Sequence, residues 1–361
     1  ALGSVTTADS NTGIGRNAGG AITTGASNTA VGALALDANT TGTHNTAVGF
    51  DALTANTTAI GNSAFGQSSL KNNTTGTSNT GLGGQALQVN STGSNNTAVG
   101  VLALYANTTA SFNTAVGRNA LVANTTGADN VGLGAETLLG NVTGDANTAV
   151  GRGALASNST ADNNTAVGRS ALLNNTTGTG NSALGKGSLG GNTTASYNTG
   201  LGENALLANT TGASNTAVGN TALSANTTAG NNTAIGTSAL AANTTGTDNV
   251  AVGANAADAL TTGSGNIALG RNALSVATIT TYNTAIGREA LAGATSGSQN
   301  SSLGNGALSG ITTGDYNTGL GYNAQTTSAT VNGQFVLGDG NITDLRCNDT
   351  SISALSDSRD K

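Results

Sequence analysis

Apolar and polar positions follow a fixed pattern that repeats every seventeen residues from Asn11 to Asn317. Counting places from that asparagine, the unit reads N-T-A-V-G-x-x-A-L-x-x-N-T-T-G-x-x. The third place is always small, the fourth is always a large apolar residue, and Gly stands at the fifth place of every unit as far as Gly338. Places eight and nine are nearly always a small residue followed by Leu. Such a strict period is typical of solenoid repeat proteins.

The unit is too short for an α-helical repeat, which needs about 30 residues, and Asn, Thr and Gly are poor helix formers. We therefore expect two short strands per unit, one at T-A-V-G and one around A-L, with Gly, Asn and Thr reversing the chain between them. Each unit then forms one rung of a parallel β-roll or β-helix, with rungs ~4.8 Å apart and twenty units spanning roughly 95 Å. The predicted fold class is all-β, a solenoid of 17-residue rungs.

The predicted solenoid shaft covers residues 1–338, and a neck without the repeat follows at 339–361. Ala1 and Leu2 fit places eight and nine of an earlier unit, so we expect a fragment that opens in mid-repeat. Neighbouring strand residues face opposite ways, so the third and fourth places point to opposite sides. The pattern leaves open which of the two sides faces the core. The asparagine column is expected to stack its amides from rung to rung and to cap the turns.

Each rung buries only two large aliphatic side chains, worth ~2 kcal/mol each. Ordering the backbone costs ~1 to 2 kcal/mol per residue, so a lone thin roll is marginal. We therefore expect a homo-oligomer in which the copies pack some of their apolar side chains against one another.

Composition excludes several classes of function. Charged residues make up 8% of the chain, against roughly a quarter in an ordinary soluble domain. The net charge of -6 gives no support for a nucleic-acid partner, and no apolar run approaches the ~20 residues that cross a membrane. With His44 as the only histidine, a single cysteine and scattered acids, the sequence predicts no metal site, no cofactor and no enzyme activity in this segment.

Basic residues concentrate at the sixth place, which holds seven of the eleven in the chain. They are Arg16, Arg118, Arg152, Arg169, Lys186, Arg271 and Arg288. On stacked rungs they form a basic column, whose mutual repulsion calls for compensation. One interpretation is a solvated surface that keeps the rod soluble. The other is recognition of an acidic surface glycan, in which exposed Tyr197, Tyr282 and Tyr316 could stack on sugars.

The N-T-A-V-G core, as at residues 96–100, resembles the head repeat of trimeric autotransporter adhesins. The N-S-V-A-I-G-like motif of that family forms a trimeric left-handed parallel β-roll. The resemblance extends from Asn11 to about Gly338, although the unit here is longer and its core motif one residue shorter. It implies a homotrimer.

The last six residues, S-D-S-R-D-K, resemble the entry to the endosialidase-type intramolecular chaperone at the C-terminus of phage tail fibres and tailspikes. In that family the chaperone is cut off after three chains have assembled. The resemblance implies autoproteolytic release between Ser356 and Asp357, with the catalytic residues of the chaperone lying outside this chain.

Together, the two resemblances predict the structural shaft of a phage tail fibre at the virion surface. The implied partners are two further copies, other virion or fibre proteins, and a host cell-surface glycan or protein receptor, with no membrane insertion. The first alternative is the head of a bacterial cell-surface trimeric adhesin. The second is an ice-binding solenoid, although adjacent threonines such as Thr40 and Thr41 are expected to face opposite ways, which weakens it.

Overall fold

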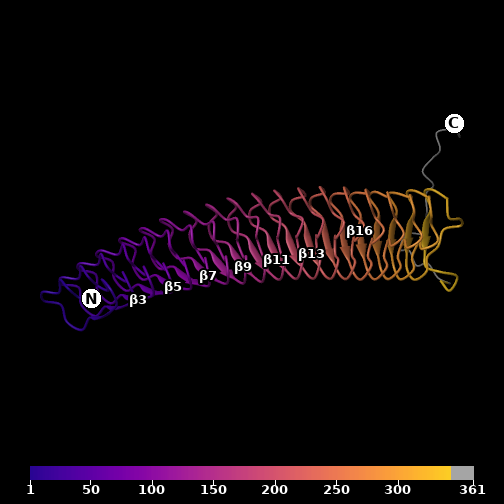
Figure 1. Ribbon diagram of the computed structural model, residues 1–361. Coiled ribbons are helices and arrows are strands. Elements are labelled where there is room, and N and C mark those ends of the chain that lie inside the picture. The colour runs from indigo at the N-terminus through magenta and orange to yellow at the C-terminus, as the bar shows by residue number, and fades with distance from the viewer. Residues whose placement is uncertain (343–361) are drawn as a thin grey trace, which may run out of the picture.

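Each 17-residue unit closes one turn of a solenoid in the computed structural model, which describes residues 1–342. The rungs stack into an elongated, gently curved rod, with the N-terminal rungs at one end and the last described rungs at the other (Figure 1). None of the described residues is helical.

One strand of three residues occupies the second to fourth places of each unit. The strands are β1 (Thr12–Ile14), β2 (Thr29–Val31), β3 (Thr46–Val48), β4 (Ser63–Phe65), β5 (Thr80–Leu82), β6 (Thr97–Val99), β7 (Thr114–Val116), β8 (Val131–Leu133), β9 (Thr148–Val150), β10 (Thr165–Val167), β11 (Ser182–Leu184), β12 (Thr199–Leu201), β13 (Thr216–Val218), β14 (Thr233–Ile235), β15 (Val250–Val252), β16 (Ile267–Leu269), β17 (Thr284–Ile286), β18 (Ser301–Leu303), β19 (Thr318–Leu320) and β20 (Phe335–Leu337).

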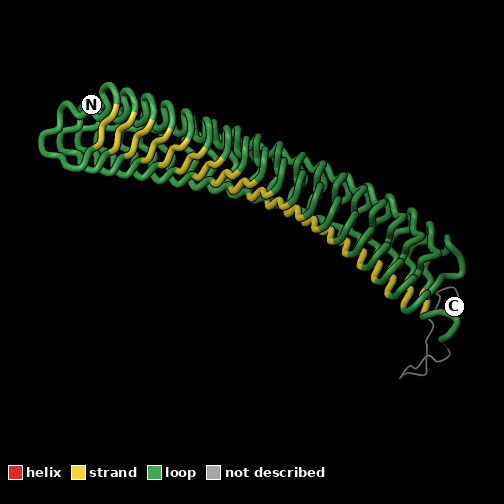
Figure 2. Tube along the Cα trace, turned by 60° about the horizontal axis from the view of Figure 1, so that its bottom comes forward, coloured by secondary structure: helices red, strands yellow, loops and turns green. Residues whose placement is uncertain are grey.

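Consecutive strands pair in parallel and in register, so that each residue faces the one a full period later, as Ala30 faces Ala47. The twenty strands form one sheet, which runs as a continuous winding row along the rod (Figure 2). Backbone hydrogen bonds also join the rungs outside the strands: the amide N of Leu36 donates to Ala52 O at 2.9 Å. The predicted all-β parallel solenoid is confirmed.

The second predicted strand, around places eight and nine, is wrong. Places six to eleven form turns, and the backbone is left-handed at the seventh and ninth places, with φ of 62° at Leu34 and 54° at Leu36. A β-strand needs φ near -120°. These left-handed residues reverse the chain direction. The eighth- and ninth-place residues, such as Ala35 and Leu36, therefore enter the core from a turn and not from a strand.

The third-place residues face the core and the fourth-place residues face outward. In β2 to β19 the middle strand residue is buried, whereas the third strand residue is not buried in any of the twenty. The ninth-place leucines, such as Leu36 and Leu53, are fully buried against the third-place alanines. The core is therefore a thin layer of Ala and Leu.

Two asparagine ladders complete the interior. At the first place, Asn45 donates its backbone N–H to Oδ1 of Asn28 at 3.0 Å and its Nδ2 to Ala59 O at 2.8 Å. At the twelfth place, Asn56 Nδ2 donates to Asn39 Oδ1 at 2.9 Å. The predicted stacking and capping are confirmed, and because these side chains are buried, each hydrogen bond satisfies a group that water cannot reach.

The twelfth-place ladder ends at Asn243, because the next rung carries Leu260 at that place. Asn243 still donates to Asn226 Oδ1 at 3.0 Å, but its own Oδ1 has no partner. The column continues as Ala277, Ala294 and Ile311, all fully buried, so the interior of the last rungs is more apolar.

Ser69 and Gly81 illustrate how one core position constrains another. Ser69 replaces the usual eighth-place Ala, and its Oγ donates to Gly81 O at 2.9 Å. A Cβ on Gly81 would collide with Ser69 Oγ, whereas the equivalent pair Ala52 and Ala64 carries a methyl on both sides. Gly81 is therefore matched to the larger side chain of Ser69.

We expect Gly81→Ala alone to lower the free energy of unfolding by about 1 to 3 kcal/mol, as overpacking does. The double variant Ser69→Ala/Gly81→Ala restores the common alanine pair and is expected to regain most of that loss. Urea unfolding followed by circular dichroism measures both variants. Equal destabilisation in the single and double variants would show that the two positions are not coupled.

Candidate functional site

An apolar seam runs along the outside of the sheet. We give this name to the fourth-place residues, found at every seventeenth position from Ile14 to Leu337. None of them is buried: Leu184 is 49% exposed and Leu201 is 40% exposed. Large contiguous apolar surface of this kind marks an interaction site.

The seam is flanked on the same face by the second-place residues, since residues two apart in a strand share a side. A shallow trough of about 250 Å³ lies there over β10 to β12. Val167, Leu184 and Leu201 line it together with Thr165 and Thr199. Packing another chain on this face would cover aliphatic side chains and place threonine hydroxyls beside them.

The predicted basic column stands on a different edge of the rod, because the sixth place directly follows the glycine that ends each strand. Three of its members are paired by two carboxylates on neighbouring rungs. Lys186 Nζ lies 2.9 Å from Glu203 Oε1. Glu136 pairs with two bases: Arg118 Nη2 lies 3.1 Å from its Oε1, and Arg152 Nε lies 3.8 Å from its Oε2. Glu289 Oε1 likewise pairs with two bases, at 3.6 Å from Arg271 Nη2 and 3.7 Å from Arg288 Nη1.

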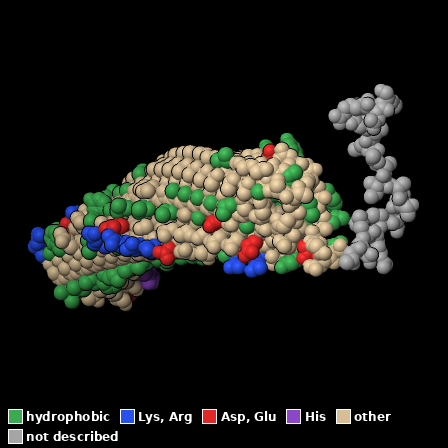
Figure 3. All heavy atoms as spheres, turned by 90° about the vertical axis from the view of Figure 1, so that its right-hand side faces the viewer, with side chains coloured by type: hydrophobic (Ala, Val, Ile, Leu, Met, Phe, Trp, Pro, Cys, Tyr) green, Lys and Arg blue, Asp and Glu red, His purple; other side chains and the backbone are tan. Residues whose placement is uncertain are grey.

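These carboxylates supply the compensation that stacked cations require, and Figure 3 shows basic side chains grouped beside acidic ones. The hydrogen bond and charge of Lys186 hold the pKa of Glu203 below its usual value. This pairing is hard to predict from the sequence because Glu136 and Glu289 occupy the seventh place, one residue away from the basic column. The sequence signal is an acid one period after a base, as Glu203 is to Lys186, or one period plus one residue after it, as Glu136 is to Arg118.

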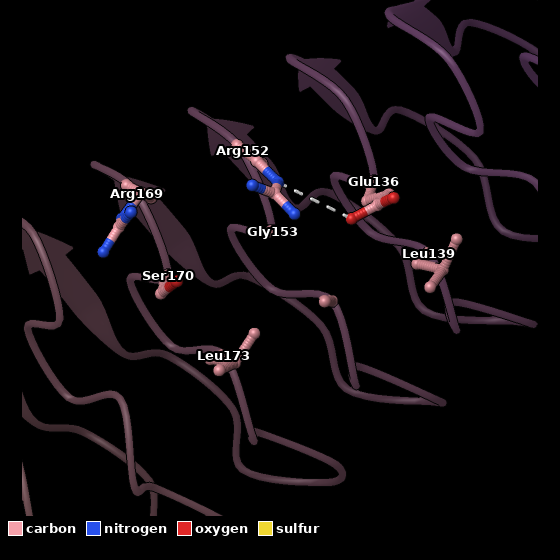
Figure 4. A pocket seen from close by; sticks show the side chains of 8 residues that line it. Glu136, Leu139, Arg152, Gly153, Arg169, Ser170 and Leu173 are labelled. Carbon is pink, nitrogen blue, oxygen red and sulfur yellow. Dashed lines mark ion pairs between the residues drawn. The ribbon is translucent and has the colours of Figure 1, made fainter.

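Arg169 and Arg16 differ from the other members, because neither makes an ion pair with any residue between 1 and 342. Arg169 lies one rung from Arg152 and one rung from Lys186. It lines an open groove of about 270 Å³ (Figure 4). The groove residues are Glu136, Leu139, Arg152, Gly153, Ala156, Arg169, Ser170 and Leu173.

The tyrosines predicted to stack on sugars, Tyr197, Tyr282 and Tyr316, lie at the seventeenth place and do not line this groove. Tyr197 is 70% exposed and Tyr282 is 67% exposed. Each ring lies against the glycine of the preceding rung, Gly180 and Gly265 respectively. The structure therefore does not bring the tyrosines together with the basic groove.

The threonine pairs lie in bends rather than in strands. The first threonine is half-buried, and its hydroxyl donates to the backbone of the next rung, as Thr40 Oγ1 does to Thr57 O at 3.3 Å. The second, such as Thr41, is exposed. Only one of the two threonine columns thus presents its hydroxyls fully to solvent.

The predicted cleavage junction, Ser356 and Asp357, lies outside the described residues, as does most of the predicted neck. Within residues 1–342 there is no group of three or more His, Cys, Asp or Glu side chains that could hold a metal ion. The same stretch holds no helix long and apolar enough to cross a membrane.

Comparison with known proteins adds no family to these observations. The chain matches no protein-family model, and no curated protein matches it.

Proposed function

We propose that the chain is the shaft of a phage tail fibre and that three copies assemble along the apolar seam. The observation that carries this proposal is the seam itself, which exposes one large aliphatic or aromatic residue per rung from Ile14 to Leu337. A monomer would leave this surface in water over its whole length.

Assembly along the seam follows from the energetics of the rung. Burying apolar surface contributes roughly 25 cal/mol per Å². Leu184 is 49% exposed, so assembly could bury up to about half of its surface and gain the corresponding free energy. Each rung adds a similar small amount, so the total grows with the number of rungs. Identical chains in register would bring fourth-place residues of the same level together around one axis.

The shape of the molecule favours a spacer over a compact binding domain. The rungs repeat without insertion, which makes a long rod of nearly constant cross-section (Figure 1). The fibre assignment also draws on the resemblance of the S-D-S-R-D-K ending to a fibre chaperone junction, with release between Ser356 and Asp357. We further propose that the shaft touches the host surface while it projects a receptor-binding tip.

Immunogold electron microscopy with antibodies against this chain tests the proposal. We expect label along thin fibres at the tails of phage particles, and mature chains that end at Ser356 by mass spectrometry. Label on the surface of uninfected bacteria, with no label on phage particles, would contradict the fibre and favour the adhesin alternative.

A further inference from the structure

The groove beside Arg169 exists because one rung carries small residues where its neighbours carry larger ones. At the seventh place the middle rung has Gly153 between Glu136 and Ser170. At the tenth place it has Ala156 between Leu139 and Leu173. Two coincident small residues therefore cut a notch across three consecutive rungs (Figure 4).

The charge in this notch is only partly balanced. Arg152 Nε lies 3.8 Å from Glu136 Oε2, and Glu136 is shared with Arg118. Figure 4 draws this ion pair, whereas Arg169 is exposed and makes no ion pair within residues 1–342. The groove thus holds the guanidinium of Arg169, Leu173 on the same rung, and Leu139 two rungs away on the far side beside Glu136 (Figure 4).

We propose that this groove binds a pyranose ring that carries a carboxylate, as part of an acidic surface glycan. This inference rests on the proposed contact of the shaft with the host surface. Arg169 binds the carboxylate, because a planar guanidinium can donate two parallel hydrogen bonds to it. Leu139 and Leu173 pack against the carbon-bound hydrogens of the ring, and the Ser170 hydroxyl can bond ring hydroxyls.

The size and the neighbours of the groove favour this ligand. Its volume of about 270 Å³ suits a single ring more than an extended drug-sized molecule. The Glu136 carboxylate on the opposite side repels a second negative group on the ligand. It therefore favours a ligand with a single acidic group and neutral hydroxyls elsewhere. An uncharged sugar would leave Arg169 unpaired, so it should bind more weakly.

Saturation-transfer difference NMR on the assembled full chain tests the proposal, with methyl β-D-glucuronide as the probe and methyl β-D-glucoside as its neutral match. We expect clearly stronger transfer to the glucuronide than to the glucoside. Arg169→Ala should weaken glucuronide binding about tenfold, the loss expected for a hydrogen-bonded charge. Ala156→Leu should abolish it by filling the notch without changing any charge.

Arg16→Ala is the matched control, because Arg16 occupies the same place of its rung and also makes no ion pair within the described residues. It should bind the glucuronide like the unchanged protein. Equal transfer to the glucoside, no transfer to either sugar, or unchanged binding in Ala156→Leu would each overturn the inference. Stronger binding of glucose 6-phosphate than of the glucuronide would overturn the carboxylate assignment.

Light scattering on the same samples separates this inference from the proposed function. A trimer that binds neither sugar contradicts sugar binding in the groove but leaves the proposed assembly standing. A monomer contradicts the proposed assembly, whatever the sugars do.

Discussion

Gly83→Ala is expected to destabilise the stack by about 3 kcal/mol or more. Gly83 has a φ of 138°, in a region that residues with a Cβ rarely adopt, and a Cβ there would lie 2.6 Å from the carbonyl group of Gly100 on the next rung. Backbone atoms of a stacked rung cannot move aside without opening the ladder. The rungs from Gly15 to Gly304 repeat this contact with the carbonyl group of the next fifth-place glycine, which explains why that place is Gly there.

The neighbouring glycine provides the control. A Cβ on Gly84 would meet no atom within 4 Å, and other rungs carry Ala at this sixth place, as Ala33 and Ala135 do. Gly84→Ala is therefore expected to change the free energy of unfolding by no more than about 0.5 kcal/mol. Thermal and urea unfolding compare the two variants. Equal stability of both would show that rung-to-rung contact at the fifth place does not hold the stack.

Replacing Leu184 with Glu, Leu201 with Lys and Val218 with Glu is expected to convert the proposed trimer to monomers. These three seam residues occupy consecutive rungs. The alternating signs attract one another within a chain, so the isolated solenoid should tolerate them. In a symmetric trimer each level would bring three like charges together out of water, and an unpaired buried charge costs several kcal/mol.

The matched control carries the same three charges at the tenth place of three consecutive rungs, at Leu207, Ser224 and Ala241. Leu207 is 41% exposed, almost the same as Leu201 at 40%, yet it lies at the tenth place, off the seam. The control should remain trimeric in sedimentation velocity, while the seam variant sediments as a monomer with an unchanged circular dichroism spectrum. Loss of assembly in both variants, or in neither, would contradict a specific seam.

Much of the fold could be predicted because each constraint is repeated in every rung. The asparagine and glycine columns indicated stacked rungs, and the structure shows their cause in amide ladders and in close backbone contacts at Gly83. The strand at T-A-V-G was predicted correctly. The strand predicted around A-L was wrong, because an apolar pair fits a strand or a turn equally well. Hydrophobic periodicity also does not reveal which residues, such as Leu36, have a left-handed backbone.

The candidate site was predictable only in part. The basic column follows from one place in the repeat, but its pairing with Glu136 depends on an offset of one residue between neighbouring rungs. The notch at Gly153 and Ala156 depends on the coincidence of two small residues within one rung. Which face of the strand points outward also had to come from the structure, because third and fourth places alternate in the same way whichever side holds the core.

The mass of the native full chain in solution tests the central claim most directly. Multi-angle light scattering coupled to size exclusion should give about 104 kDa, three times the 34.5 kDa of one chain, with an elution volume earlier than that of a globular protein of this mass. A mass of 34.5 kDa that persists at high protein concentration would contradict assembly along the apolar seam and, with it, the fibre shaft.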